Sequence, residues 1–355
     1  MERCKRLMSE LEKRGLDAAL LHRSENMRYL TDGYTGEGCV FVCKDEIVIV
    51  TDFRYVEQAG RQAPACRVVS TDAKHREISR VQELTDAYGV KAMAVETDFL
   101  SYDSVEEMKK QLPFVKLEAM KGIPEELRLI KDAGEMESIR AAAAISCRAF
   151  ENILDKIHPG MTEKQVQIIL DYEMLSLGSE CNAFDTIAAT GINGSLCHAI
   201  PSDTAIQSGD LLTLDFGATI NGYRSDMTRT IGFGKVKPEL KEMYNLVLEA
   251  QLAALDAVRP GALCGDIDKI ARDILEARYP GAFGHSLGHG VGLFIHEQPR
   301  VATGSTTVLQ PGHVITIEPG VYIPGLGGCR IEDMAMLTSE GYVNPITSPK
   351  QLIEL

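Results

Sequence analysis

GDLLTLDFGATINGYRSDMTRT, residues 209–230, is the stretch around which the rest of the chain is organised. A mostly apolar, strand-forming run contains Asp215 and leads to Asn221-Gly222, the dipeptide that most favours a two-residue type I′ turn. That turn places Gly217 opposite Asp226, so Asp215 and Asp226 share one face of a hairpin as diagonal neighbours. Two such carboxylates repel unless they are protonated or bind a cation. Two solvent-facing acids on an edge hairpin would give the same pattern, so the hairpin alone leaves the choice open.

The same pattern recurs near the C-terminus. GDLLTLDFG returns as GHVITIEPG, residues 312–320, and the second copy closes with RIED. Asp215 therefore matches Glu318 and, across a longer turn, Asp226 matches Glu332. Two halves related by a pseudo-twofold axis would bring both hairpins together, and four converging carboxylates remain ionised only beside cations. Two divalent ions balance their charge, so a two-metal site is the leading interpretation.

Composition and charge exclude several classes of protein. The chain has 355 residues, which suggests two domains, with 45% hydrophobic and 25% charged residues. A net charge of −14 argues against nucleic acid and membrane surfaces as partners. The N-terminal MERCKRLMSELEKRG is typical of an amphipathic helix rather than a signal peptide, and we expect no membrane span. The nine scattered cysteines indicate small buried hydrophobes in a reducing cytoplasm.

Residues 1–122 are expected to form an α/β domain with a mixed sheet, because short apolar strands alternate with helical segments. The predicted strands are residues 18–21, 39–43, 46–51 and 92–96, and the predicted helices are residues 2–14, 54–61, 74–89 and 101–111. Residues 120–124 are interpreted as a linker between this domain and the next.

Residues 123–355 are expected to form an α+β domain with an internal repeat. Helices are predicted at residues 132–157, 162–178, 238–258 and 266–278. Thr162 and Gln165 have the spacing of a capping box at the start of the second of these helices. Each half of the repeat thus has two helices followed by antiparallel hairpins, which predicts a curved sheet that carries the acids.

Histidines lie close to these acids in the sequence: His198, His285, His289 and His296. His285 and His289 have the i, i+4 spacing of a helical zinc motif, but the four glycines of GHSLGHGVG disfavour a helix. Glycines instead let the backbone approach a ligand closely. A lone histidine is more often a hydrogen-bonded core or surface residue, whereas three in one glycine-rich segment favour a functional cluster. One imidazole among four carboxylates favours Mn²⁺, with Co²⁺, Fe²⁺ or Zn²⁺ as alternatives.

Six ordered motifs resemble those of the pita-bread metallopeptidases. They are FDTIAATG (184–191), HAIPSD (198–203), LDFGATINGYRSDMTRT (214–230), GHSLGHGVGLFIHE (284–297), IEPGVYIPG (317–325) and RIED (330–333). Within this family the chain is most similar to Xaa-Pro aminopeptidases and to Xaa-Pro dipeptidases, the prolidases. The resemblance covers residues 125–355, and the N-terminal domain resembles, more weakly, the creatinase-like N-terminal domain of the same enzymes. It implies a pita-bread catalytic domain after an α/β domain.

The resemblance also implies roles for particular residues in a site with two divalent ions. The implied metal ligands are Asp215, Asp226, His289, Glu318 and Glu332, of which Asp226 and Glu332 bridge both ions. The implied substrate-binding residues are His198, His285, His296, Tyr322 and Arg330. The implied catalytic residues are His198, His296 and Glu318. Here His296 donates to the developing oxyanion and Glu318 relays a proton to the leaving nitrogen.

The implied reaction is hydrolysis of the bond between an N-terminal residue and proline in short peptides, by a homodimer. One alternative is a prolidase that acts only on dipeptides, and another is a non-catalytic pita-bread module that binds peptides. The complete ligand set argues against that module and against a creatinase-like hydrolase that works without metal. Departures from the family pattern occur at Cys197, Arg224 and Leu287, and they leave substrate preference open.

Overall fold

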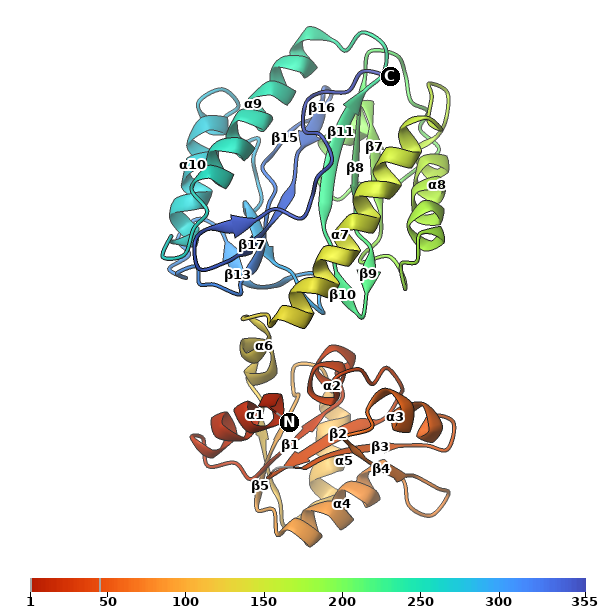
Figure 1. Cartoon of the computed structure of the whole chain (residues 1–355), viewed down its shortest axis with the longest axis vertical. Coiled ribbons are helices and arrows are strands. Elements are labelled where there is room, and N and C mark those ends of the chain that lie inside the picture. Colours follow the sequence, from red (N-terminus) through yellow and green to blue (C-terminus); the bar gives the residue numbers. More distant parts are fainter. Residues whose placement is uncertain (1, 45) are drawn as a thin grey trace. The chain divides into compact units, whose positions relative to one another are not determined.

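The computed structural model describes residues 2–44 and 46–355. The chain divides into two compact units, Met1–Arg128 and Leu129–Leu355, each with its own sheet structure (Figure 1). The first unit ends with α6 (Ile123–Arg128), which packs against the N-terminal helix of the same unit. The domain boundary predicted from the sequence falls after residue 122, immediately before this short helix.

The first unit is built on a six-stranded sheet in the order β4-β3-β2-β1-β5-β6. Its strands are β1 (Ala18–Leu21), β2 (Cys39–Cys43), β3 (Glu46–Thr51), β4 (Arg67–Ser70), β5 (Ala92–Val95) and β6 (Lys116–Ala119). Its other helices are α1 (Glu2–Glu12), α2 (Ser24–Thr31), α3 (Val56–Gln62), α4 (Glu77–Tyr88) and α5 (Tyr102–Gln111). β1 pairs antiparallel with β2 and parallel with β5, so the mixed sheet expected from the sequence is confirmed.

Apolar central strands hold the first unit together. β1 and β2 are buried along their whole length, and their side chains alternate between the two faces of the sheet. On one face, Val81 and Leu84 of α4 and Met108 of α5 pack into the core. The edge strands β4 and β6 are only partly buried, and α2 has eight residues. These three elements were not predicted from the sequence, because short segments carry little hydrophobic periodicity.

The second unit contains two pairs of packed helices, one pair in each half of the repeat (Figure 1). They are α7 (Ala133–Leu154) with α8 (Glu163–Ser176), and α9 (Pro238–Asp256) with α10 (Cys264–Glu276). α8 begins at the predicted capping box. The Thr162 hydroxyl accepts from the backbone N–H of Gln165, and the Gln165 side chain accepts from the backbone N–H of Thr162.

Antiparallel strands lie between the helix pairs. The first half contributes β7 (Ile187–Thr190), the 3₁₀ helix η1 (Gly191–Ser195), β8 (Leu211–Phe216), β9 (Thr219–Ile220), β10 (Tyr223–Arg224) and β11 (Met227–Gly232). The second half contributes β12 (Gly288–Gly290), β13 (Glu297–Val301), β14 (Val314–Ile317), β15 (Gly320–Ile323), β16 (Gly327–Arg330), β17 (Asp333–Leu337) and β18 (Tyr342–Val343). The strand orders are β11-β8-β7 and β13-β12-β14-β17-β18, with β9–β10 and β15–β16 as two-stranded hairpins.

The first hairpin has the predicted turn and register. Asn221 and Gly222 both have positive φ angles, 51° and 74°, as a type I′ turn requires. Ile220 pairs with Tyr223, and the same register continues through β8 and β11. It therefore places Gly217 opposite Asp226, as the sequence predicts.

The second hairpin repeats this arrangement with one difference. Ile317 pairs with Asp333 and Gly320 pairs with Arg330, so the register between these pairs places Glu318 directly opposite Glu332. In the first hairpin the two acids are diagonal instead. The two halves meet where the backbone N–H of Glu332 donates to the carbonyl of Thr228 at 3.1 Å. On the opposite face of the second sheet, apolar side chains pack against α9 and α10.

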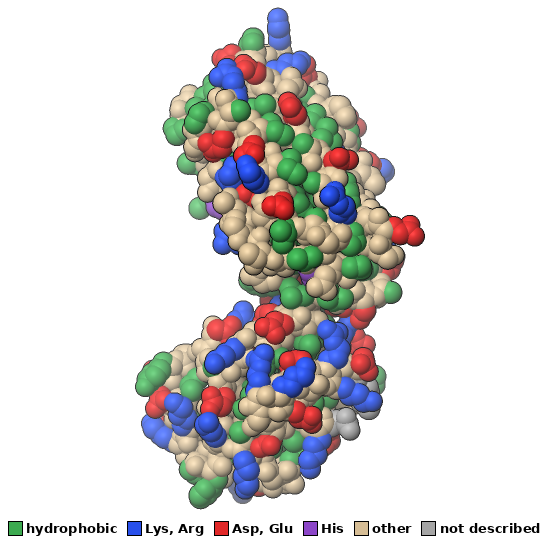
Figure 2. Space-filling view, turned by 90° about the vertical axis from the view of Figure 1, so that its left-hand side faces the viewer, with side chains coloured by type: hydrophobic (Ala, Val, Ile, Leu, Met, Phe, Trp, Pro, Cys, Tyr) green, Lys and Arg blue, Asp and Glu red, His purple; other side chains and the backbone are tan. Residues whose placement is uncertain are grey.

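Six of the nine cysteines are buried, in line with the expectation that most are small hydrophobic side chains. In the described part of the chain, no helix combines the length and the apolar character that a membrane span requires. Acidic and basic side chains are interspersed on the visible face of each unit (Figure 2), which is the pattern of an ordinary solvated surface.

Candidate metal centre

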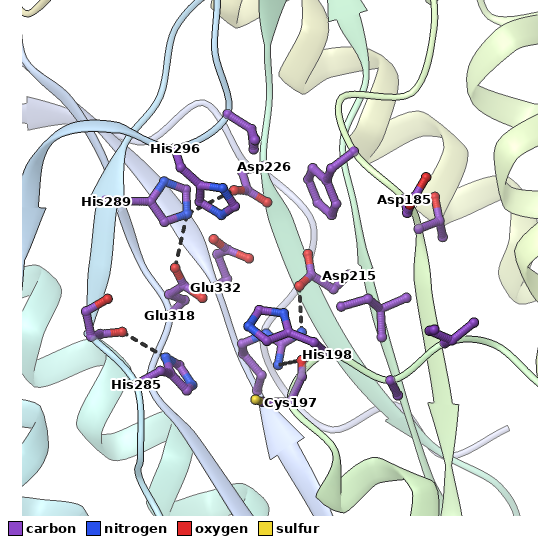
Figure 3. Close-up of a pocket in the computed structure, with 18 of the residues that line it drawn as sticks. Asp185, Cys197, His198, Asp215, Asp226, His285, His289, His296, Glu318 and Glu332 are labelled. Carbon is purple, nitrogen blue, oxygen red and sulfur yellow. Dashed lines mark hydrogen bonds and ion pairs between the residues drawn. The ribbon is translucent and has the colours of Figure 1, made fainter. Parts of the chain in front are cut away.

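A cavity of about 910 Å³ lies in the second unit and is lined from both halves of the repeat (Figure 3). All five predicted metal ligands line it, together with His198, His285, His296 and Arg330. The five occupy separate segments: Asp215 on β8, Asp226 before β11, His289 on β12, Glu318 after β14 and Glu332 between β16 and β17. The repeat thus brings together the acids that the sequence pattern matched to one another.

The first hairpin contributes two buried acids. Asp215 and Asp226 are only 8% and 4% exposed. Burial raises the pKa of both carboxyls, and the charge of Asp215 raises the pKa of Asp226 further. Arg330 Nη2 lies 2.5 Å from Asp215 Oδ2 and offsets part of the effect on that carboxyl. These shifts are the expected consequence of acids gathered away from water without enough positive charge.

The second hairpin contributes two acids whose pKa values are shifted in opposite directions. Glu332 is 1% exposed, and burial, followed by the charges of the other three acids, raises its pKa well above the ordinary value. Its Oε2 accepts a hydrogen bond from Thr228 Oγ1 at 2.7 Å. Burial also acts on Glu318, but the hydrogen bond and charge of His289 outweigh it and lower the Glu318 pKa. Thr316 Oγ1 donates to Glu318 Oε1 at 3.1 Å and holds this side chain in place.

His289 lies on an extended strand, as the glycines around it predict. A Cβ at Gly288 would lie 2.0 Å from the carbonyl oxygen of Thr316, and one at Gly290 would lie 2.1 Å from that of Gln298. Side chains other than hydrogen are therefore excluded at both positions by the close approach of neighbouring strands. The prediction that His285 and His289 do not share a helix is confirmed.

The tautomer of His289 follows from its neighbours. Its Nδ1–H donates to the carbonyl of Gly290 at 3.0 Å. Nε2 then faces the acids, 3.3 Å from Glu318 Oε1 and 3.5 Å from Asp226 Oδ2. This is the arrangement in which an imidazole presents Nε2 to a metal while a backbone carbonyl fixes the ring.

The residues of the cavity fit divalent cations. Asp226, His289 and Glu332 each offer a ligand atom within 4.8 Å of the other two. Among the described residues, Asp215 Oδ1 and Glu332 Oε1 are buried and have no hydrogen-bond partner. Leaving a buried acceptor unsatisfied costs about 1–3 kcal/mol, so such atoms call for an ion or a donor. Four carboxylates and one imidazole match the ligand preferences of Mn²⁺, Co²⁺, Fe²⁺ and Zn²⁺.

Arg330, Tyr322 and His285 form a chain of hydrogen bonds beside the acids. Arg330 Nη1 donates to Tyr322 Oη at 2.7 Å, and Tyr322 Oη lies 3.0 Å from His285 Nε2. His285 Nδ1–H donates to the Ser286 carbonyl at 2.8 Å, so the neutral ring accepts from Tyr322. Burial lowers the His285 pKa and favours that neutral form. Tyr322 lies behind the residues that line the cavity, and Arg330, 3% exposed, points at Asp215.

His198 and His296 are the exposed histidines of the cavity. His198 follows η1, and His296 lies in the loop between β12 and β13. The ring of His296 contacts that of His289 edge-on, with centroids 4.5 Å apart. Burial of the ring, and then the positive charge of His289, lower the pKa of His296. Both side chains are therefore more accessible to a molecule in the cavity than His285, which lines the cavity but is half-buried.

Several residues in or beside the cavity were not predicted from the sequence. Thr228 lies opposite Asp215 in the hairpin and donates to Glu332, so its position could have been deduced from the predicted register. Lys164 and Arg300 line the cavity but lie outside the motifs that carry the acids and histidines. Nothing in the pattern around these two cations signals that they face the same space.

Sequence comparisons assign the chain to a family. The profile of metallopeptidase family M24 matches residues 137–339, and that of the creatinase/prolidase N-terminal domain matches residues 3–130. The chain therefore belongs to metallopeptidase family M24. The predicted fold, an α/β N-terminal domain followed by a pita-bread catalytic domain, is confirmed.

Individual relatives match the whole chain. The Xaa-Pro dipeptidase from Bacillus anthracis superposes with a TM-score of 0.96 at 41% identity, covering 100% of this chain and 99% of that one. The X-Pro aminopeptidase from Thermotoga maritima gives 0.91 at 32% identity, covering 99% and 100%. The Xaa-Pro dipeptidase of Pyrococcus furiosus is 36% identical over 354 residues, 99% of each chain. The names of these relatives divide between dipeptidases and an aminopeptidase.

Proposed function

We propose that this metallopeptidase is an Xaa-Pro aminopeptidase that uses two divalent ions, with Mn²⁺ as the preferred metal. The observation that supports it is the convergence of four acids and one imidazole, with two buried carboxylate oxygens left without partners. In this proposal Asp226 and Glu332 would contribute to holding both ions. Asp215 would hold one ion, and His289 and Glu318 would hold the other.

Bound divalent ions would supply a Lewis acid for the scissile carbonyl and an activated water. The side chains of the chain bind and orient the substrate. The acidic cluster attracts the free α-amine of the peptide. His296 donates an N–H to the developing oxyanion, a role supported by its exposure and by its ring contact with His289. A neutral imidazole can make this donation, so the lowered pKa of His296 is compatible with it.

The remaining groups transfer a proton, bind the substrate or position a metal ligand. Glu318, held by Thr316, relays a proton to the leaving nitrogen. The leaving prolyl nitrogen carries no N–H in the substrate, so the cavity needs no acceptor there. His198 binds the substrate from the exposed side of the cavity. A chain of hydrogen bonds runs from His285 through Tyr322 to Arg330, and the Arg330 guanidinium binds Asp215. The three residues therefore act together to position Asp215.

The size of the cavity supports a substrate longer than a dipeptide. About 910 Å³ is near the upper end of the range for ligand pockets, roughly 300–1,000 Å³. A prolidase is the second candidate, favoured by the names of two of the relatives above. The cations Lys164 and Arg300 in the cavity wall also favour it, because they could bind the free carboxylate of a dipeptide.

Product analysis with Mn²⁺ added separates the two candidates. The substrates are an Xaa-Pro dipeptide, the same dipeptide as its C-terminal amide, and an Xaa-Pro-Yaa tripeptide. The aminopeptidase releases the N-terminal residue from all three, whereas the prolidase cleaves only the free dipeptide. Arg300→Gln should lower kcat/KM for the free dipeptide alone if the carboxylate binds there. Failure to cleave any of the three with Mn²⁺ or Co²⁺ would refute the proposed function.

We further propose that the protein acts on short proline-containing peptides as a cytoplasmic homodimer. The scattered cysteines without C-x-x-C spacing support a reducing compartment. Light scattering of the purified chain tests the dimer, and a mass equal to one chain at working concentration would contradict it.

A further inference from the structure

A second cluster of potential metal ligands lies in the first unit, outside the cavity described above. It consists of His22 directly after β1, Cys39 at the start of β2 and Glu77 at the start of α4. One ligand atom from each residue lies within 4.8 Å of the ligand atoms of the other two. None of these residues takes part in the proposed peptidase reaction.

The local fold explains why the three side chains meet. Leu21 pairs with Val40 across β1 and β2, so the same antiparallel register places His22 opposite Cys39 on one face of the sheet. The helix α4 packs on that face through Val81, which shares a core cluster with Cys39. Glu77 precedes Val81 by four residues and therefore lies on the same side of the helix, above the end of β1.

The contacts of His22 show an incompletely satisfied imidazole. Its Nε2 lies 3.0 Å from Glu77 Oε1. Its Nδ1 is buried and has no hydrogen-bond partner among the described residues. The side chain of His22 is 12% exposed and that of Glu77 is 35% exposed, whereas Cys39 is fully buried. The cluster thus has a closed side formed by the thiol and an open side through which an ion can enter.

A simple ion pair between His22 and Glu77 would give Nε2 of the imidazole a partner but would leave Nδ1 without one. It would also leave no role for the thiol beside them. We propose that His22, Cys39 and Glu77 form a zinc site, with water as the fourth ligand. Imidazole nitrogen, thiolate sulfur and carboxylate oxygen are the ligands that Zn²⁺ takes in proteins, and three protein ligands leave one position for solvent.

The thiol binds Zn²⁺ by exchanging its proton for the ion. Burial, followed by the charge of Glu77, raises the pKa of the Cys39 thiol, so a free thiolate does not persist there. When Zn²⁺ enters, the sulfur forms a bond to the metal and the thiol proton leaves to solvent. This chemistry distinguishes the cluster from the M24 centre, whose five proposed ligands include no sulfur.

Cobalt titration of the full chain, first stripped with a chelator, tests the proposal. Co²⁺ replaces Zn²⁺ at such sites and gives a near-ultraviolet charge-transfer absorption only when a thiolate binds it. Wild-type protein should develop this band with the intensity of one thiolate-bound Co²⁺ per chain, in addition to the Co²⁺ held at the M24 centre, and Cys39→Ala should abolish it. Glu77→Gln, a change at a partly exposed side chain, should weaken Co²⁺ binding at this band by at least on the order of 10-fold.

Three variants serve as controls. Cys43→Ala removes a buried thiol from the other end of the same strand, and Cys197→Ala removes the thiol that lines the M24 cavity. His289→Ala changes the M24 centre itself. All three should keep the band. Competition with Zn²⁺ should remove the band, and wild-type protein should retain one more Zn²⁺ per chain than Cys39→Ala.

Two results would overturn the zinc site. One is a wild-type titration in which Co²⁺ binds without any thiolate band. The other is a band that survives Cys39→Ala or disappears with Cys197→Ala, because the thiolate would then belong to another site. Equal melting temperatures of wild type and Glu77→Gln in the presence of chelator would show that the second variant is folded, so that its weaker binding reports on the ligand.

Discussion

Replacing Asp333 with Asn should destabilise the second unit more than any surface substitution. Asp333 follows Glu332 in the sequence but points to the opposite face of the sheet, where it pairs with Arg229 at 2.7 Å. The Arg229 guanidinium uses all five of its N–H donors. The acceptors are Asp333 and the backbone carbonyls of Thr228, Glu332, Ser348 and Pro349. This pair joins the two halves of the repeat directly behind the proposed metal centre.

The magnitude follows from the burial of the pair. The side chains of Arg229 and Asp333 are 1% and 0% exposed, so the discount for solvent screening that applies to surface pairs does not apply. Removing one partner of a buried pair costs about 3–5 kcal/mol, because the other charge is left uncompensated. One kcal/mol shifts the melting temperature of a unit of this size by about 2–4 °C. We therefore expect Asp333→Asn to lower it by about 6–20 °C.

Thermal unfolding of wild type and Asp333→Asn in a chelating buffer measures this effect without the contribution of bound metal. Asp273→Asn is the matched control, because Asp273 pairs with Lys269 on an exposed helix face, where both side chains are more than 60% exposed. The control should change stability by less than about 1 kcal/mol. If Asp333→Asn melted within a degree or two of the control, the idea that this buried pair holds the two halves together would be wrong.

Further predictions concern the metal centre and pH. His289→Ala should lower the metal content measured by elemental analysis, whereas His198→Ala and His296→Ala should keep the metal and lose kcat by on the order of 10²-fold or more; the reverse pattern would contradict the assignment. Metal-free Glu332→Gln should melt no lower than the metal-free wild type, because it removes one repelling acid, yet should gain much less from Mn²⁺; equal gains would argue against a bridging role. Burial and the charge of Lys131 lower the pKa of His313 to about 4 from its ordinary 6.5. Between pH 6.5 and about 4 the unfolded chain therefore binds more protons than the folded chain. The free energy of unfolding consequently falls as the pH is lowered from about 7 to 4. His313→Asn should reduce this loss by about 2–3 kcal/mol in chemical unfolding, and an unchanged pH slope would refute the assignment.

Much of the fold could be predicted because its signals are local. β2 and β3 are short apolar runs bounded by polar residues, and their ends agree with the prediction to the residue. The Asn221-Gly222 turn fixes a register, and the register fixes which residues share a face. The missed strands β4 and β6 are stabilised mainly by pairing with a neighbour at the sheet edge. That stabilisation depends on residues far away in the sequence, which a local pattern cannot reveal.

The candidate site could be predicted only as far as the repeat and the family resemblance extend. Both pointed to the acids, and the glycines around His289 indicated an extended backbone rather than a helix. The contacts of Arg330 were not predictable, because they join β16 to Asp215 in the other half of the chain. The contact between His22 and Glu77 was likewise not predictable, since it depends on how α4 packs against the sheet.

The two arginines that precede the matched acids do not follow the internal symmetry of the repeat, although the acids do. Matching Asp226 to Glu332 also matches Arg224 to Arg330, since each arginine precedes its acid by two residues. Arg330 pairs with Asp215 of the other half, so strict symmetry would pair Arg224 with Glu318. Arg224 instead donates to the carbonyl of Ala183 at 2.6 Å and lies over an aromatic ring.

His289 takes the place beside Glu318 that symmetry would give to an arginine, 3.3 Å from its carboxylate. This exchange matters because a guanidinium keeps its proton and cannot bind a metal, whereas an imidazole can lose its proton and become a ligand. Arg330 therefore uses part of the acceptor capacity of Asp215 Oδ2, whereas Oδ1 has no partner among the described residues and is open to an ion. On the other side of the centre, both the His289 imidazole and the Glu318 carboxylate are open to an ion. The repeat determines where the four acids lie, and the departure from it makes the two sides of the centre chemically different.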